Sequence, residues 1–175
     1  MIDVEIESHS GFCGGVIRAI DCAEKFLAAN SRLYSLGAIV HNESELERLS
    51  ALGLVPLDVE DLDEMPDARG ENILIRAHGQ PPKVYRKLEG LGFNVIDCTC
   101  PVVLNIQESI RRTCEGFGPG MSQIVLFGKI GHPEVLGLVC QCENFPDVKV
   151  IIVESLNQAK EKLDLGIISK DLPTA

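Results

Sequence analysis

The sequence predicts an α/β protein in which repeated strand–helix units form two small, mostly parallel sheets flanked by helices. The main observation is that short apolar runs alternate with segments whose apolar residues recur at helical spacing, about six times along the chain. The chain has 175 residues, enough to bury the core of one ordinary domain or two small ones. Apolar residues make up 45% and charged residues 24% of the chain, as in soluble globular proteins.

Each predicted element follows from its own pattern. Apolar runs predict strands at residues 4–6, within 33–40, and at 54–57, 73–75, 95–96, 124–127 and 148–153. Helical spacing predicts helices at residues 16–27, 43–52, 82–91, 102–114, 133–140 and 156–163. Residues 58–69 are acidic and irregular, and residues 116–120 form a glycine-rich loop. A strand followed by a helix, repeated in this way, is typical of parallel sheets with helices on their faces.

The pattern divides near residue 100. The stretch DCTCP at residues 97–101 closes one strand–helix unit and opens the next. We therefore expect a first α/β domain at residues 1–99 and a second at residues 100–175.

Charge and composition exclude several classes of protein. Acidic residues outnumber basic ones by 26 to 16, and the formal net charge is −10. An acidic chain without a basic run is a poor candidate for binding nucleic acid or an anionic membrane surface. No stretch approaches the roughly 20 apolar residues of a membrane span, and the acidic N-terminus predicts no signal peptide. The sequence therefore predicts a cytoplasmic protein.

The chain has seven cysteines, which in a reducing compartment are thiols or metal ligands before they are disulfides. Cys22 and Cys114 lie on apolar helical faces and are predicted to fill the core, since a buried thiol packs as a small hydrophobe. Cys140 and Cys142 are predicted to be structural, because a helix that continued through them would point them about 200° apart. Composition does not decide whether Cys98 or Cys100 faces a site.

Polar and thiol side chains follow the predicted strands, each directly before a helix. The candidate site residues are Cys13, His41, His78, Cys100, His132 and Glu134. In open α/β sheets, ligands bind at the carboxyl ends of the strands. His9, by contrast, reads as a surface residue.

The chemistry of these candidates is coherent. Helix N-termini and histidine donors together bind phosphate-like anions, and neighbouring glycines let the backbone approach closely. Glu134 could act as a general acid if desolvation raised its pKa. Thiolates hold soft metals or an iron–sulfur cluster.

Five motifs occur in a fixed order: GFCGGV at residues 11–16, VHN at 40–42, AHG at 77–79, DCTCP at 97–101 and GHPEV at 131–135. In order and spacing the chain resembles the N-terminal part of the 4-hydroxy-3-methylbut-2-enyl diphosphate reductase family. The resemblance implies a three-domain, pseudo-threefold enzyme around a [4Fe-4S] cluster held by one cysteine from each domain. It also implies the last reaction of non-mevalonate isoprenoid biosynthesis, which yields isopentenyl and dimethylallyl diphosphate.

The resemblance assigns a role to each candidate. Cys13 and Cys100 become cluster ligands, and Cys98 a neighbour. The three candidate histidines, His41, His78 and His132, would contact the diphosphate of the allylic substrate. Glu134 would deliver protons toward the leaving hydroxyl, and a ferredoxin or flavodoxin would supply electrons.

The resemblance also sets expectations that the 175 residues do not meet. The family's third cluster cysteine and a Ser-x-Asn motif lie beyond residue 175, and a Gln-Thr-Thr motif is expected soon after Leu165, where the chain reads GIISKDLPTA. We therefore expect a truncated reductase that lacks its third domain and is incompletely active. The alternative is a non-catalytic α/β module that binds an anion or zinc, for which a closed tetrahedral set of Cys and His ligands is typical.

Overall fold

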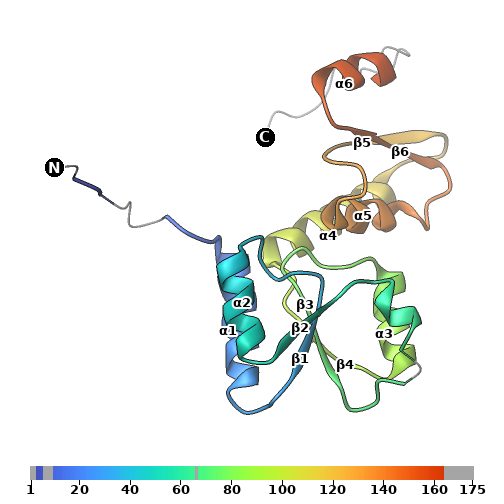
Figure 1. Cartoon of the computed structure of the whole chain (residues 1–175). Coiled ribbons are helices and arrows are strands. Elements are labelled where there is room, and N and C mark those ends of the chain that lie inside the picture. The colour runs from blue at the N-terminus through green and yellow to red at the C-terminus, as the bar shows by residue number, and fades with distance from the viewer. Residues whose placement is uncertain (1–2, 6–9, 66, 164–175) are drawn as a thin grey trace. The chain divides into compact units, whose positions relative to one another are not determined.

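The computed structural model describes residues 3–5, 10–65 and 67–163. The chain forms two compact units, Met1–Leu104 and Asn105–Ala175, and each is considered by itself (Figure 1). This division lies inside one helix, α4 (Pro101–Gly116), a few residues after the boundary expected at 99/100. Three predictions concern residues outside the described ranges. They are the surface position of His9, the last residue of the strand predicted at residues 4–6, and the Gln-Thr-Thr motif expected soon after Leu165.

The first unit contains a four-stranded parallel sheet with the order β2-β1-β3-β4. Its strands are β1 (Leu33–Leu36), β2 (Leu54–Leu57), β3 (Asn72–Ile75) and β4 (Asn94–Asp97). All three pairings are parallel, with Tyr34 opposite Ile73 and Ile75 opposite Asp97. The parallel sheets predicted from the alternating pattern are therefore confirmed.

Helices cover both faces of this sheet (Figure 1). One face packs against α1 (Gly14–Leu27) and α2 (Glu43–Ala51), and the other against α3 (Pro82–Leu91). Side chains alternate between the faces along each strand, so Leu74 joins the α1/α2 core, whereas Ile73 and Ile75 join the α3 core. A strand buried on both faces must be apolar throughout, which explains the continuous apolar runs in the sequence.

The second unit contains a two-stranded parallel sheet of β5 (Ser122–Phe127) and β6 (Val148–Val153). Its helices are the C-terminal part of α4, α5 (Pro133–Val139) and α6 (Leu156–Leu163), with a 3-10 turn at Cys140–Cys142. A Cβ atom at Gly137 would lie 3.0 Å from Gln107 Nε2, which shows how closely α5 packs on α4.

The first predicted strand differs from the structure. Residues 3–5 form no strand, and Val4 is 82% exposed. No strand of the described sheet pairs with them, so nothing buries the apolar side of their alternating pattern. The strand predicted within residues 33–40 is present as β1, which ends at Leu36 before Gly37 with φ +75°.

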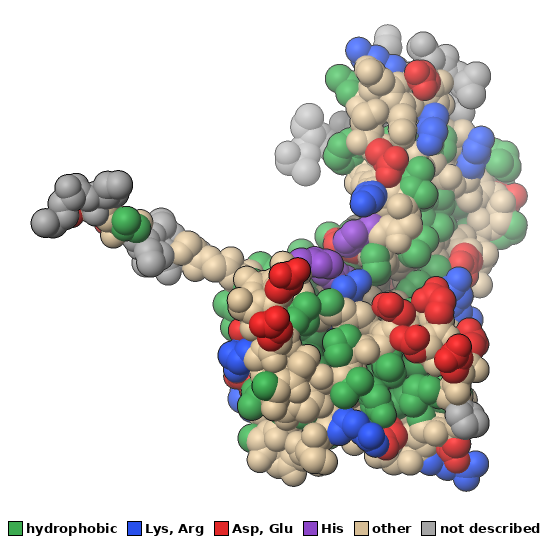
Figure 2. Space-filling view, viewed as in Figure 1, with side chains coloured by type: hydrophobic (Ala, Val, Ile, Leu, Met, Phe, Trp, Pro, Cys, Tyr) green, Lys and Arg blue, Asp and Glu red, His purple; other side chains and the backbone are tan. Residues whose placement is uncertain are grey.

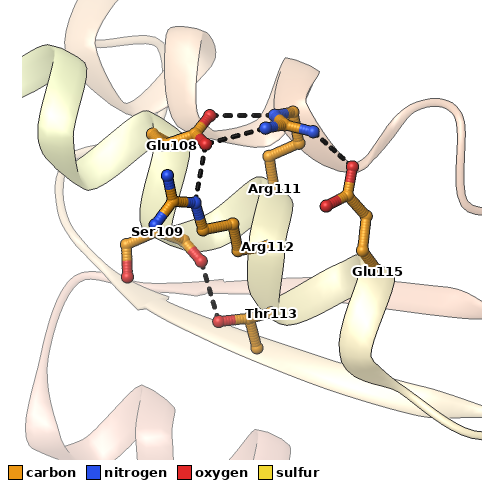
Figure 3. A network of polar contacts seen from close by, with 6 residues as sticks. All are labelled: Glu108, Ser109, Arg111, Arg112, Thr113 and Glu115. Atoms are coloured by element: carbon orange, nitrogen blue, oxygen red, sulfur yellow. Dashed lines mark hydrogen bonds and ion pairs between the residues drawn. The ribbon is translucent and has the colours of Figure 1, made fainter.

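Helix α4 carries a surface ladder of ion pairs in the second unit (Figure 3). The Arg111 guanidinium donates to both carboxylate oxygens of Glu108, at 2.9 and 2.7 Å, and also pairs with Glu115. Arg112 Nε donates to Glu108 at 2.7 Å. These bonds lower the pKa of Glu108 to about 2, chiefly through Arg111 and then Arg112.

Within the part of the chain that the structure describes, no helix combines the length and the apolar character needed to cross a bilayer.

Candidate iron–sulfur and diphosphate site

Three of the candidates follow adjacent parallel strands of the first sheet. His41 follows β1, His78 follows β3 and Cys100 follows β4, and these strands are neighbours in the order β1-β3-β4. Parallel strands end at the same edge, so the topology brings the three segments to one carboxyl edge of the sheet. This is the edge at which the sequence pattern predicts a ligand.

Cys13 reaches the same edge through helix α1. It is the N-cap residue of α1, with its carbonyl accepting from Ile17 N at 3.0 Å, and its exposed thiol makes no capping bond. Gly15, in the first turn, is buried. A Cβ atom there would lie 3.0 Å from Cys100 Sγ and 3.6 Å from the Ala77 side chain. The helix start that carries Cys13 therefore rests directly on the ends of β3 and β4.

Both thiols stand at helix N-termini. Cys100 directly precedes α4, and its carbonyl accepts from Leu104 N at 3.0 Å, as the Cys13 carbonyl does for α1. The free N–H groups and partial positive charge of a helix start favour an anionic sulfur ligand. Gly11 and Gly14, on either side of Cys13, have no atom within 4 Å of an added Cβ, so the backbone beside this thiol is open. Two such thiols suit an iron–sulfur cluster by their donor chemistry.

The structure separates Cys98 from Cys100, which composition does not do. Cys98 is 2% exposed and belongs to the α1/α2 core, where its thiol bonds to Cys22. Burial raises the pKa of Cys98 to about 12, so it stays a neutral thiol, whereas metal ligands are thiolates. Cys100 lies half-exposed at the sheet edge. Of these two thiols, only Cys100 is therefore accessible to a ligand at this edge.

The loop that carries His41 is anchored by Arg76. The guanidinium Nη1 donates to the Ala38 carbonyl at 2.9 Å, and the group packs against Gly37, where a Cβ atom would lie 3.2 Å away. Burial lowers the pKa of Arg76. Asn42, the N-cap of α2, accepts from Glu45 N at 3.0 Å and fixes the other side of His41. His41 is thus an exposed ring on a firmly held loop, and Figure 2 shows histidine side chains at the surface of the molecule.

His78 lies half-buried in the turn after β3. The turn closes with Gly79 N donating to the Arg76 carbonyl at 3.0 Å, and Gly79 has φ +70°. Only glycine adopts this left-handed conformation without strain, which explains the glycine after the histidine in AHG.

His132 and Glu134 lie in the second unit, after β5. His132 is the N-cap of α5, and its Nδ1 accepts from the Glu134 backbone N–H at 3.3 Å. A neutral ring with an accepting Nδ1 carries its proton on Nε2, which is then a hydrogen-bond donor. Glu134 is half-buried in the first helical turn. The two side chains are therefore linked through one short segment of backbone.

Three of the remaining cysteines pack in the cores. Cys114 and Cys142 are buried with their Sγ atoms 3.6 Å apart, and Cys22 packs against the first core, as predicted for Cys22 and Cys114. Helix α5 ends at Val139, so Cys140 and Cys142 lie on a 3-10 turn and not on one continuous helix. Within residues 3–5, 10–65 and 67–163, no three side chains of His, Cys, Asp or Glu gather closely enough to hold a metal ion.

Sequence reasoning missed two parts of this site. One is Arg76, which holds the His41 loop, and the other is a hydrogen-bond network of Tyr85, Asp97 and Thr99 beside Cys100. The only sequence signal for the network was a polar Thr99 between two cysteines. The signal for Arg76 was a charged residue at the end of an apolar strand.

Comparison with known proteins agrees with this geometry. The family model described as LytB protein matches residues 4–171. The chain belongs to the LytB family. Two curated relatives of this LytB chain are the 4-hydroxy-3-methylbut-2-enyl diphosphate reductases of Bacteroides thetaiotaomicron, 46% identical over 164 residues, and Porphyromonas gingivalis, 46% identical over 165 residues. The alignments cover 94% of this chain and 54% and 53% of the relatives, so the chain spans about half their length.

Solved structures of LytB-type reductases share the fold. A structure of (E)-4-hydroxy-3-methyl-but-2-enyl diphosphate reductase, described as the terminal enzyme of the non-mevalonate pathway, is 37% identical with a TM-score of 0.73. The match covers 94% of this chain and 55% of that one. The reductase of Plasmodium falciparum is 27% identical with a TM-score of 0.72, covering 88% and 45%. The predicted resemblance to this family is therefore confirmed.

Proposed function

We propose that this LytB chain supplies two of the units that form the active site of a 4-hydroxy-3-methylbut-2-enyl diphosphate reductase. The observation that carries the proposal is the juxtaposition of Cys13 and Cys100: the start of α1 rests on Cys100 through the buried Gly15. The names of the reductases that the chain resembles support the same activity.

We assign two cluster ligands to this chain, Cys13 and Cys100. When bound, a [4Fe-4S] cluster supplies electrons and a Lewis-acidic iron for the substrate hydroxyl. Replacing an allylic hydroxyl by hydrogen consumes two electrons and two protons and releases water. The chain's own residues must therefore bind the diphosphate and deliver protons.

His41, His78 and His132 are proposed to bind the diphosphate of the substrate. His41 and His78 share the carboxyl edge of the first sheet, where an anion meets donors on fixed loops. His132, with its Nδ1 occupied by the Glu134 N–H, presents a donor at Nε2 in its neutral form. Such local donors can hold an anion although the chain carries a formal charge of −10.

Glu134 is the proposed proton donor for the leaving hydroxyl. Its half-buried side chain lies in the first turn of α5, and its backbone N–H donates to the His132 ring. A ferredoxin or flavodoxin is the proposed electron donor. The cytoplasm is the proposed compartment, because all seven cysteines are free thiols.

The decisive experiment is anaerobic reconstitution of the full 175-residue chain with iron and sulfide. We expect an absorption band near about 400 nm that bleaches with dithionite, as for iron–sulfur proteins in general. Cys13→Ser and Cys100→Ser should each reduce the bound iron to near background, because each removes a thiolate ligand.

Cys140→Ser is the matched control, since Cys140 lies in the second unit, where its thiol contacts Glu143. It should retain the iron of the unmodified chain. A colourless protein with stoichiometric zinc would contradict the proposal and favour the zinc-binding alternative. Cys13→Ser and Cys100→Ser variants that keep their iron would contradict the assignment of these two cysteines as cluster ligands.

A further inference from the structure

We propose that Tyr85, Asp97 and Thr99 form a positioning network that holds the Cys100 thiol in place at the start of α4. The inference rests on the proposed role of Cys100 as a cluster ligand. It concerns residues that the proposed reaction does not itself use.

The Asp97 carboxylate is the centre of the network. It accepts hydrogen bonds from Thr99 N at 2.8 Å and from the Thr99 hydroxyl, both at Oδ1. The Tyr85 hydroxyl, which comes from α3, donates to Oδ2 at 3.0 Å and lies 3.3 Å from Thr99 Oγ1. One carboxylate therefore ties the end of β4 to the helix beside it and to the residue before Cys100.

The backbone of the same segment is anchored on its other side. Cys98 N donates to the Ile75 carbonyl and Cys100 N to the Ala77 carbonyl, each at 2.9 Å. These bonds continue the β3–β4 ladder past the end of β4. The segment 97–100 is therefore extended and held by both of its edges, so its side chains must alternate in direction.

This alternation sets the direction of Cys100. Cys98 enters the α1/α2 core, Thr99 points to the network on the α3 side, and Cys100 returns to the α1 side against Gly15. Releasing Thr99 from Asp97 would leave the peptide that precedes Cys100 held only by the Cys100 N–H bond to the Ala77 carbonyl and by Arg18, whose Nη1 donates to the Thr99 carbonyl at 3.5 Å. The network thus restricts the movement of the thiol without touching it.

The polar character of the network indicates that it positions Cys100 and does not merely fill the core. Thr99 is 3% exposed, and a buried hydroxyl destabilises the fold unless it is hydrogen-bonded. An apolar side chain at this position would stabilise a core equally well. A fully bonded polar group adds instead a defined geometry, which a metal ligand requires.

The test measures the alkylation rate of each cysteine. The full iron-free chain is treated with iodoacetamide under anaerobic, native conditions, and modified peptides are quantified by mass spectrometry. In Tyr85→Phe, loss of one hydrogen bond should raise the rate at Cys100 by roughly three- to tenfold. The rate at Cys13 should stay unchanged.

Tyr34→Phe is the matched control, because Tyr34 packs against the same α3-side core and undergoes the same chemical change. It should leave both rates unaltered. Thr99→Ser keeps the hydroxyl and should behave like the unmodified chain, whereas Thr99→Val should accelerate Cys100. Equal acceleration of Cys13 and Cys100, or a Cys100 rate unchanged in Tyr85→Phe, would overturn the network.

Iron uptake separates this inference from the proposed function. If the unmodified chain takes up no iron, the proposed function fails. The alkylation rates still show whether the network of Tyr85, Asp97 and Thr99 positions Cys100. If the chain takes up iron and Tyr85→Phe shows accelerated alkylation, both stand.

Discussion

Gly15 has no side chain, which allows helix α1 to approach the sheet edge closely. A Cβ atom there would lie 3.0 Å from Cys100 Sγ and 3.1 Å from Cys100 Cβ. Cys100 cannot retreat easily, because its backbone N–H is bonded to Ala77. A Cβ atom added at the neighbouring Gly14 would have no atom within 4 Å. Substitutions at Gly14 and Gly15 therefore compare the same added methyl group in open space and against Cys100.

We expect Gly15→Ala to lower the free energy of unfolding by about 1–2 kcal/mol, because overpacking against Cys100 exceeds the gain in helix propensity. Gly14→Ala should raise it by up to about 1 kcal/mol, since alanine favours the helix and meets no neighbour. Urea denaturation of both variants measures the difference. Equal stability of the two variants would show that Cys100 yields to the added methyl.

At the scale of single elements, α4 is stabilised by its own side chains. The carboxylate of Glu108 accepts from Arg111 and Arg112, three and four residues further along the helix. This ladder lies in the second unit, on the helix that begins directly after Cys100 (Figure 3). Because the residues are exposed, the pairs are screened by salt and contribute modestly.

The ladder predicts a dependence of stability on pH. The pKa of Glu108 is lowered to about 2 in the folded chain, so its contribution is present above the usual value near 4.3 and is lost as pH falls toward 2. Glu108→Gln should therefore lower the melting temperature above about pH 5 and have no effect near pH 2.

Thermal unfolding of the unmodified chain and of Glu108→Gln, measured from about pH 2 to above about pH 5, checks this expectation. Glu47→Gln, on the exposed side of α2, is the control and should show no such trend. Roughly 1 M salt should shrink the Glu108 effect, and an effect that grows on acidification would contradict it.

At the scale of the whole molecule, the fold divides seven similar thiols into different classes. Cys98, Cys114 and Cys142 are buried, and burial raises the pKa of Cys98 and Cys142 to about 12. Cys13 alone is exposed, and Cys22, Cys100 and Cys140 are intermediate. The rate at which each cysteine is alkylated should follow this division, because only thiolates react and the reagent must reach them.

In the native, reduced chain we expect iodoacetamide to modify Cys13 first and to leave Cys98, Cys114 and Cys142 unmodified. In denaturant all seven thiols should react at similar rates. Peptide mass spectrometry after timed quenching reports each site. Early modification of Cys98 in the native state would contradict its place in the core.

Much of the fold could be predicted from hydrophobic pattern alone. The strand β2, the helices α3 and α6, and the strand β6 have the predicted bounds, because apolar period and turn residues mark both ends of each. The strand predicted at residues 4–6 failed in residues 3–5, because an alternating pattern forms a strand only beside a partner strand. The candidate site residues were identified by their position, because polar residues directly after apolar strands lie at the edge where α/β sheets bind ligands.

The sequence by itself determined the α/β class, the family and the list of candidates, since period and motif order are local properties of the chain. Only the tertiary structure decided which candidates meet. It turned Cys98 inward and Cys100 to the sheet edge, placed Gly15 against that thiol, and joined Tyr85 to Asp97 and Thr99. These contacts join residues that are distant in the chain. They result from strand order and side-chain direction, and no local sequence pattern contains that information.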